Sequence, residues 1–494
     1  MNRSSRIRLV SVTLLTLLVL ALSPVSAQDM LWSASYGGYY NEGGYSGART
    51  VDGGCLVLGS TYSFGAGDHD FYLLCIDSLG DTLWSRTYGG AEADIGYDLC
   101  PSGDGGYFAV GSTRSFGAGQ SDVYLLKIDF IGGLIWSKTY GGSEFETGLS
   151  VRATSDGGCI IAGSTSSYGA GSDDIYLIRT DSQGDTLWTR AYGGTAEDVA
   201  NAVRPTPDGG FITSGFTGSF GAGYYSLYAI RTDANGDTLW SATYGGDQAD
   251  IGYGVENTLD GGLVFVGVTA NGGYYDTYLV KTDPTGGIEW ERSYGGTQND
   301  CGYSVRSTAD GGYFIAGTTD SYGNGKIDMH VIKTNPLGIT EWDNTYGGSQ
   351  SDFCRAAVSD DGSYFLVGYS YSYAIGGSDI YLLKISAEGA TDVEDDPTDW
   401  LPESFALAQN YPNPFNLTTT IEFSLERRAN VTLTIHNILG QTVRQWPLGL
   451  VSSGLYSIDW NGLDAHGRET ASGVYLYTLE YGTMRQTRKM ILLK

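Results

Sequence analysis

The stretch Trp84-Ser85-Arg86-Thr87-Tyr88-Gly89-Gly90 decides the fold, because the phrase Trp-x-x-x-Tyr-Gly-Gly returns at regular intervals along the chain. The tryptophans that open the phrase are Trp32, Trp84, Trp136, Trp188, Trp240, Trp290 and Trp342. Successive tryptophans are 52 residues apart, except for one interval of 50. A fixed period near 50 residues is typical of a repeat architecture, in which one supersecondary unit is used several times.

Each repeat contains four strand-like runs. In the third copy they occupy residues 148–158, 159–171, 173–184 and 185–194, and each run is rich in β-branched and aromatic residues and ends at a turn signal. Four strands in each of seven repeats predict an all-β chain with a seven-bladed β-propeller over residues 28–390. The array begins with an orphan fourth strand and ends after a third strand. The N-terminal strand is therefore predicted to complete the last blade and close the ring, which leaves no free sheet edge.

Two recurring turn phrases support these blades. Asp-Gly-Gly follows the first strand of six repeats, and it predicts a tight hairpin because Asp-Gly tolerates the positive φ angles of a two-residue turn. Asp-x-x-Gly follows the third strand of five repeats and is typical of a type I turn. Both phrases are interpreted as scaffold.

The longer phrase Asp77-x-x-Gly80-x-x-x-Trp84 is similar to the tryptophan-docking repeat of the quinoprotein-type propellers. The resemblance covers the seven repeats, and it implies that the tryptophans pack between neighbouring blades as part of the core. Redox members of that family carry an adjacent cysteine pair over a quinone. No two of the six cysteines here are adjacent in sequence, so no quinone is predicted.

The charge balance excludes one class of partner. The 494 residues include 56 Asp and Glu against 28 Lys and Arg, a formal net charge of −28, whereas nucleic-acid binding needs a basic footprint. At the N-terminus, Arg3, Arg6 and Arg8 precede an apolar run over 9–22 and then Val25-Ser26-Ala27. This pattern predicts a secretory signal peptide over residues 1–27. The apolar run is shorter than a membrane span, and no transmembrane segment is predicted.

The C-terminal part differs in character from the repeats. Residues 391–403 are acidic and contain proline, which predicts a linker. Strand-like runs at 420–424, 431–436, 454–460 and 473–480 then predict a small immunoglobulin-like β-sandwich over residues 404–494.

The segment 408–416, Ala-Gln-Asn-Tyr-Pro-Asn-Pro-Phe-Asn, resembles the opening signature of the type A C-terminal sorting domains of the type IX secretion system. Segments 438–441, 471–475 and 487–494 match the same pattern in the same order. The resemblance implies the type IX secretion machinery as a partner, export across the outer membrane, and a secreted or cell-surface location. The alternative is an ordinary immunoglobulin-like accessory domain that stays on the mature protein.

Two sets of acidic residues recur on the predicted loop face. One set lies ten residues after each tryptophan: Glu42, Asp94, Glu146, Asp198, Asp250, Asp300 and Asp352. The other precedes the tyrosine or histidine of the third strand: Asp70, Asp122, Asp174, Asp276, Asp328 and Asp379. The favoured interpretation is that they cap backbone N–H groups of glycine-rich turns. The alternative is a ring that binds Ca²⁺ through carboxylate oxygens.

Ligand binding is predicted where the repeat is interrupted by tyrosines, since an exposed tyrosine offers a flat apolar face with a polar tip for sugars or protein partners. The tyrosine pairs are Tyr39 with Tyr40, Tyr224 with Tyr225, and Tyr274 with Tyr275. The last two pairs belong to neighbouring blades, and we expect them to form one patch. The alternative is that each tyrosine packs within its own loop in a tyrosine-rich protein.

The sequence favours binding over catalysis, because no hydrolase elbow, zinc-binding helix motif or Cys/His metal spacing is present. The first hypothesis is a non-catalytic binding or adhesion module for a polysaccharide or a protein. The alternatives are a glycan-degrading enzyme that uses loop-face carboxylates, and a purely structural surface component. A disulfide between Cys55 and Cys75 is a candidate, since the ends of their strands meet in a hairpin.

Overall fold

The structure is a computed structural model that describes residues 30–360, 362–386, 406–407, 410, 413–416, 418–425, 429–451, 454–464, 468–481 and 484–493. These residues form strands and turns and contain no helix. Accordingly, the described part of the chain offers no helix that is long and apolar enough to cross a membrane. The predicted signal peptide and the acidic linker lie outside the described residues.

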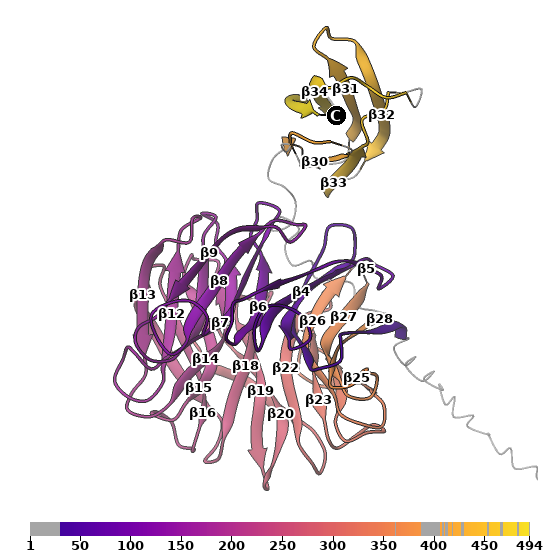
Figure 1. Ribbon diagram of the computed structural model, residues 1–494. Helices are drawn as coiled ribbons and strands as arrows, with labels where there is room; N and C mark the ends of the chain where they lie inside the picture. Colours follow the sequence, from indigo (N-terminus) through magenta and orange to yellow (C-terminus); the bar gives the residue numbers. More distant parts are fainter. Residues whose placement is uncertain are drawn as a thin grey trace, which may run out of the picture.

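Residues 30–386 form seven four-stranded antiparallel sheets, one for each repeat. Each sheet contacts the next through its innermost strand and the last contacts the first, so that the sheets make a closed ring (Figure 1). Blades one to three contain β2 (Glu42–Arg49), β3 (Cys55–Thr61), β4 (Asp70–Ile76) and β5 (Thr82–Tyr88); β6 (Asp94–Pro101), β7 (Tyr107–Thr113), β8 (Asp122–Ile128) and β9 (Leu134–Tyr140); β10 (Glu146–Ala153), β11 (Cys159–Thr165), β12 (Asp174–Thr180) and β13 (Thr186–Tyr192).

The later blades repeat this order from the innermost strand outward. Blades four to six contain β14 (Asp198–Pro205), β15 (Phe211–Thr217), β16 (Ser226–Thr232) and β17 (Thr238–Tyr244); β18 (Asp250–Asn257), β19 (Leu263–Asn271), β20 (Tyr274–Thr282) and β21 (Ile288–Tyr294); β22 (Asp300–Ser307), β23 (Tyr313–Thr319), β24 (Asp328–Thr334) and β25 (Thr340–Tyr346). Blade seven contains β26 (Asp352–Asp360), β27 (Ser363–Ser370), β28 (Asp379–Ser386) and the N-terminal β1 (Met30–Tyr36).

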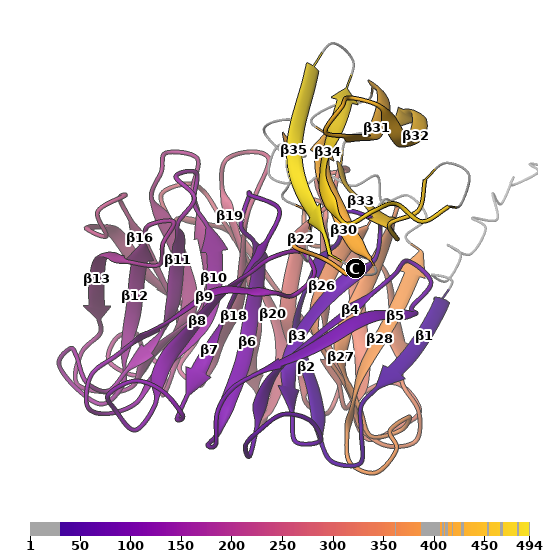
Figure 2. The same ribbon diagram turned by 45° about the horizontal axis from the view of Figure 1, so that its top comes forward.

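The N-terminal strand closes the ring. β1 pairs antiparallel with β28, with Trp32 opposite Lys384 and Tyr36 opposite Ile380. Figure 2 shows the indigo β1 beside the orange β28, although the two strands are separated by the whole propeller sequence. The predicted all-β propeller with this closure is confirmed, and the outer edge of the last blade is thus supplied by the start of the chain.

The Trp-x-x-x-Tyr-Gly-Gly phrase fastens each blade to the next. The Trp84 ring packs against Gly132 in the Asp-x-x-Gly turn of blade two, and the hydroxyl of Tyr88 donates to the carbonyl of the same glycine. Tyr140 repeats the contact with Gly184 at 2.7 Å. The tryptophans pack between blades, as predicted. They are half-buried rather than core residues, because they lie on the outermost strand of each blade.

The Asp-Gly-Gly turns differ from the predicted two-residue turn. In blade one the N–H of Gly53 donates to the Thr50 carbonyl at 3.0 Å, and Gly53 alone has a positive φ, of 81°. No residue other than glycine has a positive φ in the described residues. The aspartate therefore occupies a type I turn that a left-handed glycine completes, which is the next most common hairpin design.

The C-terminal residues form a two-sheet sandwich. One sheet has the order β29 (Ala406–Leu407), β30 (Thr419–Leu425) and β33 (Gly454–Trp460); the other has the order β32 (Thr442–Val451), β31 (Ala429–Asn437), β34 (Gly473–Tyr481) and β35 (Met484–Leu492). Its core is centred on the buried Trp460, with Phe415, Leu433 and Tyr477 in the same cluster. The predicted sandwich is confirmed. Strands β29, β32 and β35 were not predicted from the sequence; β35 carries the exposed basic residues Arg485, Arg488 and Lys489.

Candidate functional site

Blade five carries the longest hairpin on the predicted loop face. β19 and β20 extend two residues beyond the repeat, where Ala270 pairs with Tyr275 and Asn271 with Tyr274. The extension is possible because Gly272 and Gly273 connect the strands with positive φ angles of 64° and 101°. This is the two-residue turn that glycine pairs favour. The hairpin therefore carries two tyrosines beyond the point where the third strands of the other blades begin.

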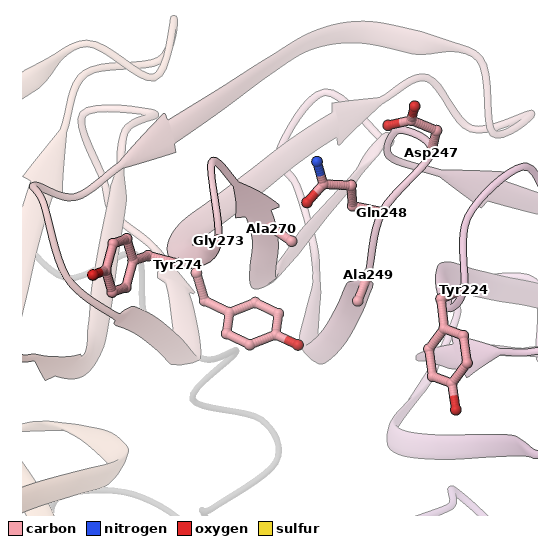
Figure 3. A pocket seen from close by; sticks show the side chains of 8 residues that line it. Tyr224, Asp247, Gln248, Ala249, Ala270, Gly273 and Tyr274 are labelled. Carbon is pink, nitrogen blue, oxygen red and sulfur yellow. The ribbon is translucent and has the colours of Figure 1, made fainter.

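These tyrosines line an open pocket between blades four and five. The pocket has a volume of about 410 Å³, and its walls include Tyr224, Tyr274 and Tyr275 together with Gln248 of the loop that joins the blades. Figure 3 shows Tyr224 and Tyr274 on opposite sides of the segment 247–249. Tyr224 is 76% exposed and Tyr274 46%. The carboxylate of Asp247 also lines the pocket, so that aromatic rings, an amide and a carboxylate surround one opening.

Not every predicted tyrosine belongs to this pocket. The hydroxyl of Tyr225 donates to Glu197 at 2.7 Å, and its ring packs on Phe216, so this residue holds the loop in place. The hydrogen bond to Glu197, with burial, raises the pKa of Tyr225 well above its usual range. Tyr39 and Tyr40 are exposed and pack on one another in the loop between blades seven and one, away from the pocket.

The first acidic set is buried rather than displayed on the surface. All seven side chains are at most 1% exposed. In every blade a carboxylate oxygen accepts from the second glycine N–H of Tyr-Gly-Gly, at 2.6–2.8 Å. The seven residues are Glu42, Asp94, Glu146, Asp198, Asp250, Asp300 and Asp352. These contacts are the turn-capping contacts of the favoured interpretation.

Glutamate and aspartate fill this position by different contacts. In blade two the carboxylate of Asp94 also accepts from the hydroxyl of Ser115 at 2.7 Å. In blade three the longer Glu146 accepts from the hydroxyl of Thr165, also at 2.7 Å, and from the backbone N–H of the corresponding serine, Ser167, at 3.1 Å. The longer side chain therefore caps the same loops.

The second acidic set caps the loop between the second and third strands, as where Asp70 accepts from the Ala66 N–H at 2.8 Å. The two sets meet at the first glycine of Tyr-Gly-Gly. A Cβ on Gly89 would lie 1.9 Å from Asp70 Oδ1 and 2.7 Å from Asp94 Oδ2. In the described residues no three His, Cys, Asp or Glu side chains gather as metal ligands. Calcium binding by the ring stays a prediction, tested by melting the protein with EDTA and with added Ca²⁺.

The candidate disulfide is not formed, and both thiols are free. Cys55 pairs in register with Ile76, whereas Cys75 pairs with Leu56. This offset of one residue sends the two side chains to opposite faces of the sheet, into different hydrophobic clusters. Burial raises the pKa of the Cys75 thiol to about 12.

A second group of residues, not predicted from the sequence, lies at the centre of the propeller. Each innermost strand has a β-bulge at its fourth residue, and a bulge re-aims a side chain. The bulged residues are Tyr45, Tyr97, Leu149, Asn201, Tyr253, Tyr303 and Arg355. All seven line one central cavity. The available signal was the arginine of the seventh copy, at a position where four copies have tyrosine.

Comparison with known families identifies one part of the chain. Residues 415–484 match the family model described as the FlgD Ig-like domain. The regulatory protein FlaEY of Caulobacter vibrioides is 32% identical over 179 residues, which cover 31% of this chain and 19% of FlaEY. The chain therefore spans about a fifth of the length of this curated relative.

Similar solved structures include PorZ, an essential surface component of the type IX secretion system of Porphyromonas gingivalis. It is 13% identical, with a TM-score of 0.41, over 93% of this chain and 61% of PorZ. The WD40 β-propeller domain of Doa1 is 11% identical, with a TM-score of 0.47, over 74% of this chain and 99% of that domain.

Proposed function

We propose that this protein is a non-catalytic binding module of the bacterial cell surface, which recognises a polysaccharide through the pocket between blades four and five. The observation that carries the proposal is the convergence of Tyr224, Tyr274 and Tyr275 on one open pocket. Each tyrosine departs from the repeat, and the rigid propeller fixes the loops that hold it. Residues that break a repeat are free to serve a ligand, whereas those that keep it serve the scaffold.

The carboxylates of the loop face support binding rather than hydrolysis. A glycosidase needs an acid and a base or nucleophile that reach the scissile bond from two sides. The first acidic set is buried and accepts hydrogen bonds from its own loops. Asp247 does line the pocket, but it stands there with one amide, Gln248, and the three tyrosines. Together these pocket side chains can orient a bound sugar, but they do not supply a second carboxylate for hydrolysis.

The proposal includes the export route and the cellular location of the protein. The segments that resemble type A sorting domains suggest export by the type IX secretion system, and the immunoglobulin-like sandwich of the C-terminal residues is compatible with that role. The test is expression with and without residues 404–494 in a bacterium that has this system. We expect the full chain at the cell surface or in the medium, and the shortened chain in the periplasm. Equal export of both would contradict the sorting role.

The binding test uses the purified full chain with a panel of insoluble and soluble polysaccharides. Protein depletion from solution and released sugar ends are read from the same tube. We expect depletion without release, and loss of depletion in the triple variant Tyr224→Ala/Tyr274→Ala/Tyr275→Ala. The control is Tyr39→Ala/Tyr40→Ala, an exposed pair on another loop, away from this pocket. Release of sugar would replace the proposal by the enzymatic alternative, and binding by the triple variant would exclude the pocket.

A further inference from the structure

The central cavity of the propeller carries an excess of positive charge in a strongly acidic protein. Its volume is about 1890 Å³, and residues from the innermost strands of all seven blades line it. The charged side chains of this lining are six arginines and four carboxylates. The whole chain has a formal net charge of −28, so this excess runs against the composition of the protein. A lining with more cationic than anionic side chains favours ligands of negative charge.

Most of these arginines have carboxylate partners. Arg152 contacts Asp98 at 2.6 Å. Arg204 contacts Glu256 at 2.8 Å, and Arg306 lies 3.7 Å from the same carboxylate. One glutamate therefore faces two guanidinium groups on this side of the cavity.

Of the six arginines in this lining, Arg355 differs from the others: Arg49 and Arg179 also have carboxylate partners, whereas no described carboxylate lies within ion-pair distance of Arg355. Its guanidinium stands 4.4 Å from the ring centre of Tyr303, and its Nη2 donates to the hydroxyl of Tyr369 at 3.1 Å. Its Nε is buried without a hydrogen-bond partner. Arg355 as a whole is half-buried at the cavity wall, and a buried donor without a hydrogen-bond partner is costly unless a ligand completes its contacts.

Aromatic rings extend from Arg355 to both sides of the cavity. Tyr303 packs against Tyr253 with ring centres 4.9 Å apart. On the other side, the ring of Tyr369 contacts that of Tyr45, which in turn contacts that of Tyr97. These tyrosines come from blades one, two, five, six and seven, and four of the five stand at the bulged position. The cavity thus combines one unpaired guanidinium with an arc of aromatic rings.

We propose that the central cavity binds an acidic sugar, with its carboxylate on Arg355 and its ring against the tyrosine arc. A guanidinium offers parallel N–H donors that match the two oxygens of a carboxylate. Tyrosine rings pack on the C–H face of a sugar, and their hydroxyls bond to its oxygens. The volume exceeds that of an ordinary small-molecule pocket, which suits a short oligosaccharide. The site is separate from the loop-face pocket and does not depend on it.

The test measures the binding of trigalacturonate to the full chain by calorimetry, with neutral galactotriose as the uncharged probe. We expect binding of the acidic trimer that weakens as salt is raised, and no binding of the neutral trimer. Arg355→Met should weaken the binding about 30-fold or more, because it removes one partner of a buried charge pair. Arg355→Lys should keep part of the affinity, since it keeps the charge without the fork. Arg292→Met is the control, because Arg292 lies over Trp290 on an outer strand.

The melting temperature of each variant separates loss of folding from loss of binding, and Arg355→Gln replaces the methionine variant if that one does not fold. Unchanged affinity in either neutral variant would overturn the proposal. Binding of a glutamate tetrapeptide in place of both sugars would overturn it as well. The Tyr224→Ala/Tyr274→Ala/Tyr275→Ala variant should bind trigalacturonate like the parent, so failure of the loop-face pocket and failure of this site are distinguishable.

Discussion

Asp98 joins three blades near the centre of the ring, and its replacement should be among the most destabilising single changes. It lies on β6 and is 8% exposed. Its carboxylate accepts from Ser46 of blade one at 2.7 Å, from Ser150 of blade three at 3.0 Å, and from Arg152 at 2.6 Å. Asp98→Asn keeps the size of the side chain but leaves Arg152 without its counter-charge.

The magnitude follows from the loss of one partner of a buried ion pair, which costs about 3–5 kcal/mol of unfolding free energy. With an unfolding entropy of ~2.1 cal/mol/K per residue, a propeller of this length should melt about 4–7 °C lower. Differential scanning calorimetry measures the shift. The control is Asp185→Asn, whose contact with Lys138 at 2.9 Å is exposed, and which should cost less than ~1 kcal/mol.

A double variant tests the cause of the shift. Asp98→Asn/Arg152→Met removes both charges, so it should melt higher than the sum of the two single effects predicts. If Asp98→Asn melts no lower than Asp185→Asn, or if the single effects of Asp98→Asn and Arg152→Met simply add, then the ion pair does not fasten the blades and the reasoning fails.

The pH dependence gives an independent check. Burial alone would raise the pKa of Asp98, but Arg152 and the Val151 N–H lower it below its usual value. A carboxylate with a lowered folded-state pKa contributes stability above its unfolded pKa of ~3.9, and loses it as the pH falls through the folded value. The difference in melting temperature between parent and Asp98→Asn should therefore be full at pH 7 and shrink in acid below about pH 4.

Three further predictions concern the scaffold. Deletion of β1 should expose the edge of β28 and make the propeller sensitive to limited proteolysis, whereas a resistant shortened protein would contradict ring closure. Gly89→Ala would place a methyl group 1.9 Å from Asp70 Oδ1, so it should lower the melting temperature measurably, and a neutral result would show that the loop yields. Cys55 and Cys75 should both react with a thiol reagent only after unfolding, and a mass lower by two hydrogens before reduction would contradict the free thiols.

The fold could be predicted from the sequence because the same contacts recur in every blade. The hydroxyl of Tyr88 donates to a glycine carbonyl in a turn of the next blade, and Tyr140 and Tyr294 make the same hydrogen bond in their own repeats. A period of 52 residues is therefore visible without any structure. The burial of the tryptophans was not predictable in the same way, since it depends on how far the neighbouring blade covers the outermost strand. The type of the Asp-Gly-Gly turn was not predictable either, since it depends on where the paired strands stop.

The candidate site was predictable only in part. Tyr224 and Tyr274 were found because they interrupt a loop phrase, and adjacent blades bring them to one pocket. The predicted Cys55–Cys75 disulfide was wrong for a reason that the repeat pattern does not contain. Strand ends that meet in a hairpin fix proximity, but the face on which a side chain lies depends on register, and a one-residue offset reverses it. Register within a blade is not encoded by the period of the repeat.

The bulged position shows how a repeat scaffold acquires a site without losing its fold. The bulge at each innermost strand is a backbone feature, so the residue there can vary while the strand pairing is unchanged. Four copies place tyrosine at this position and the seventh places Arg355, and all of these side chains face the same cavity. Because the ring brings seven such positions to one axis, a single substitution in one repeat changes the chemistry of the whole centre. In a protein of this design, departures from the repeat at the bulge carry more functional information than the acids that recur in every blade.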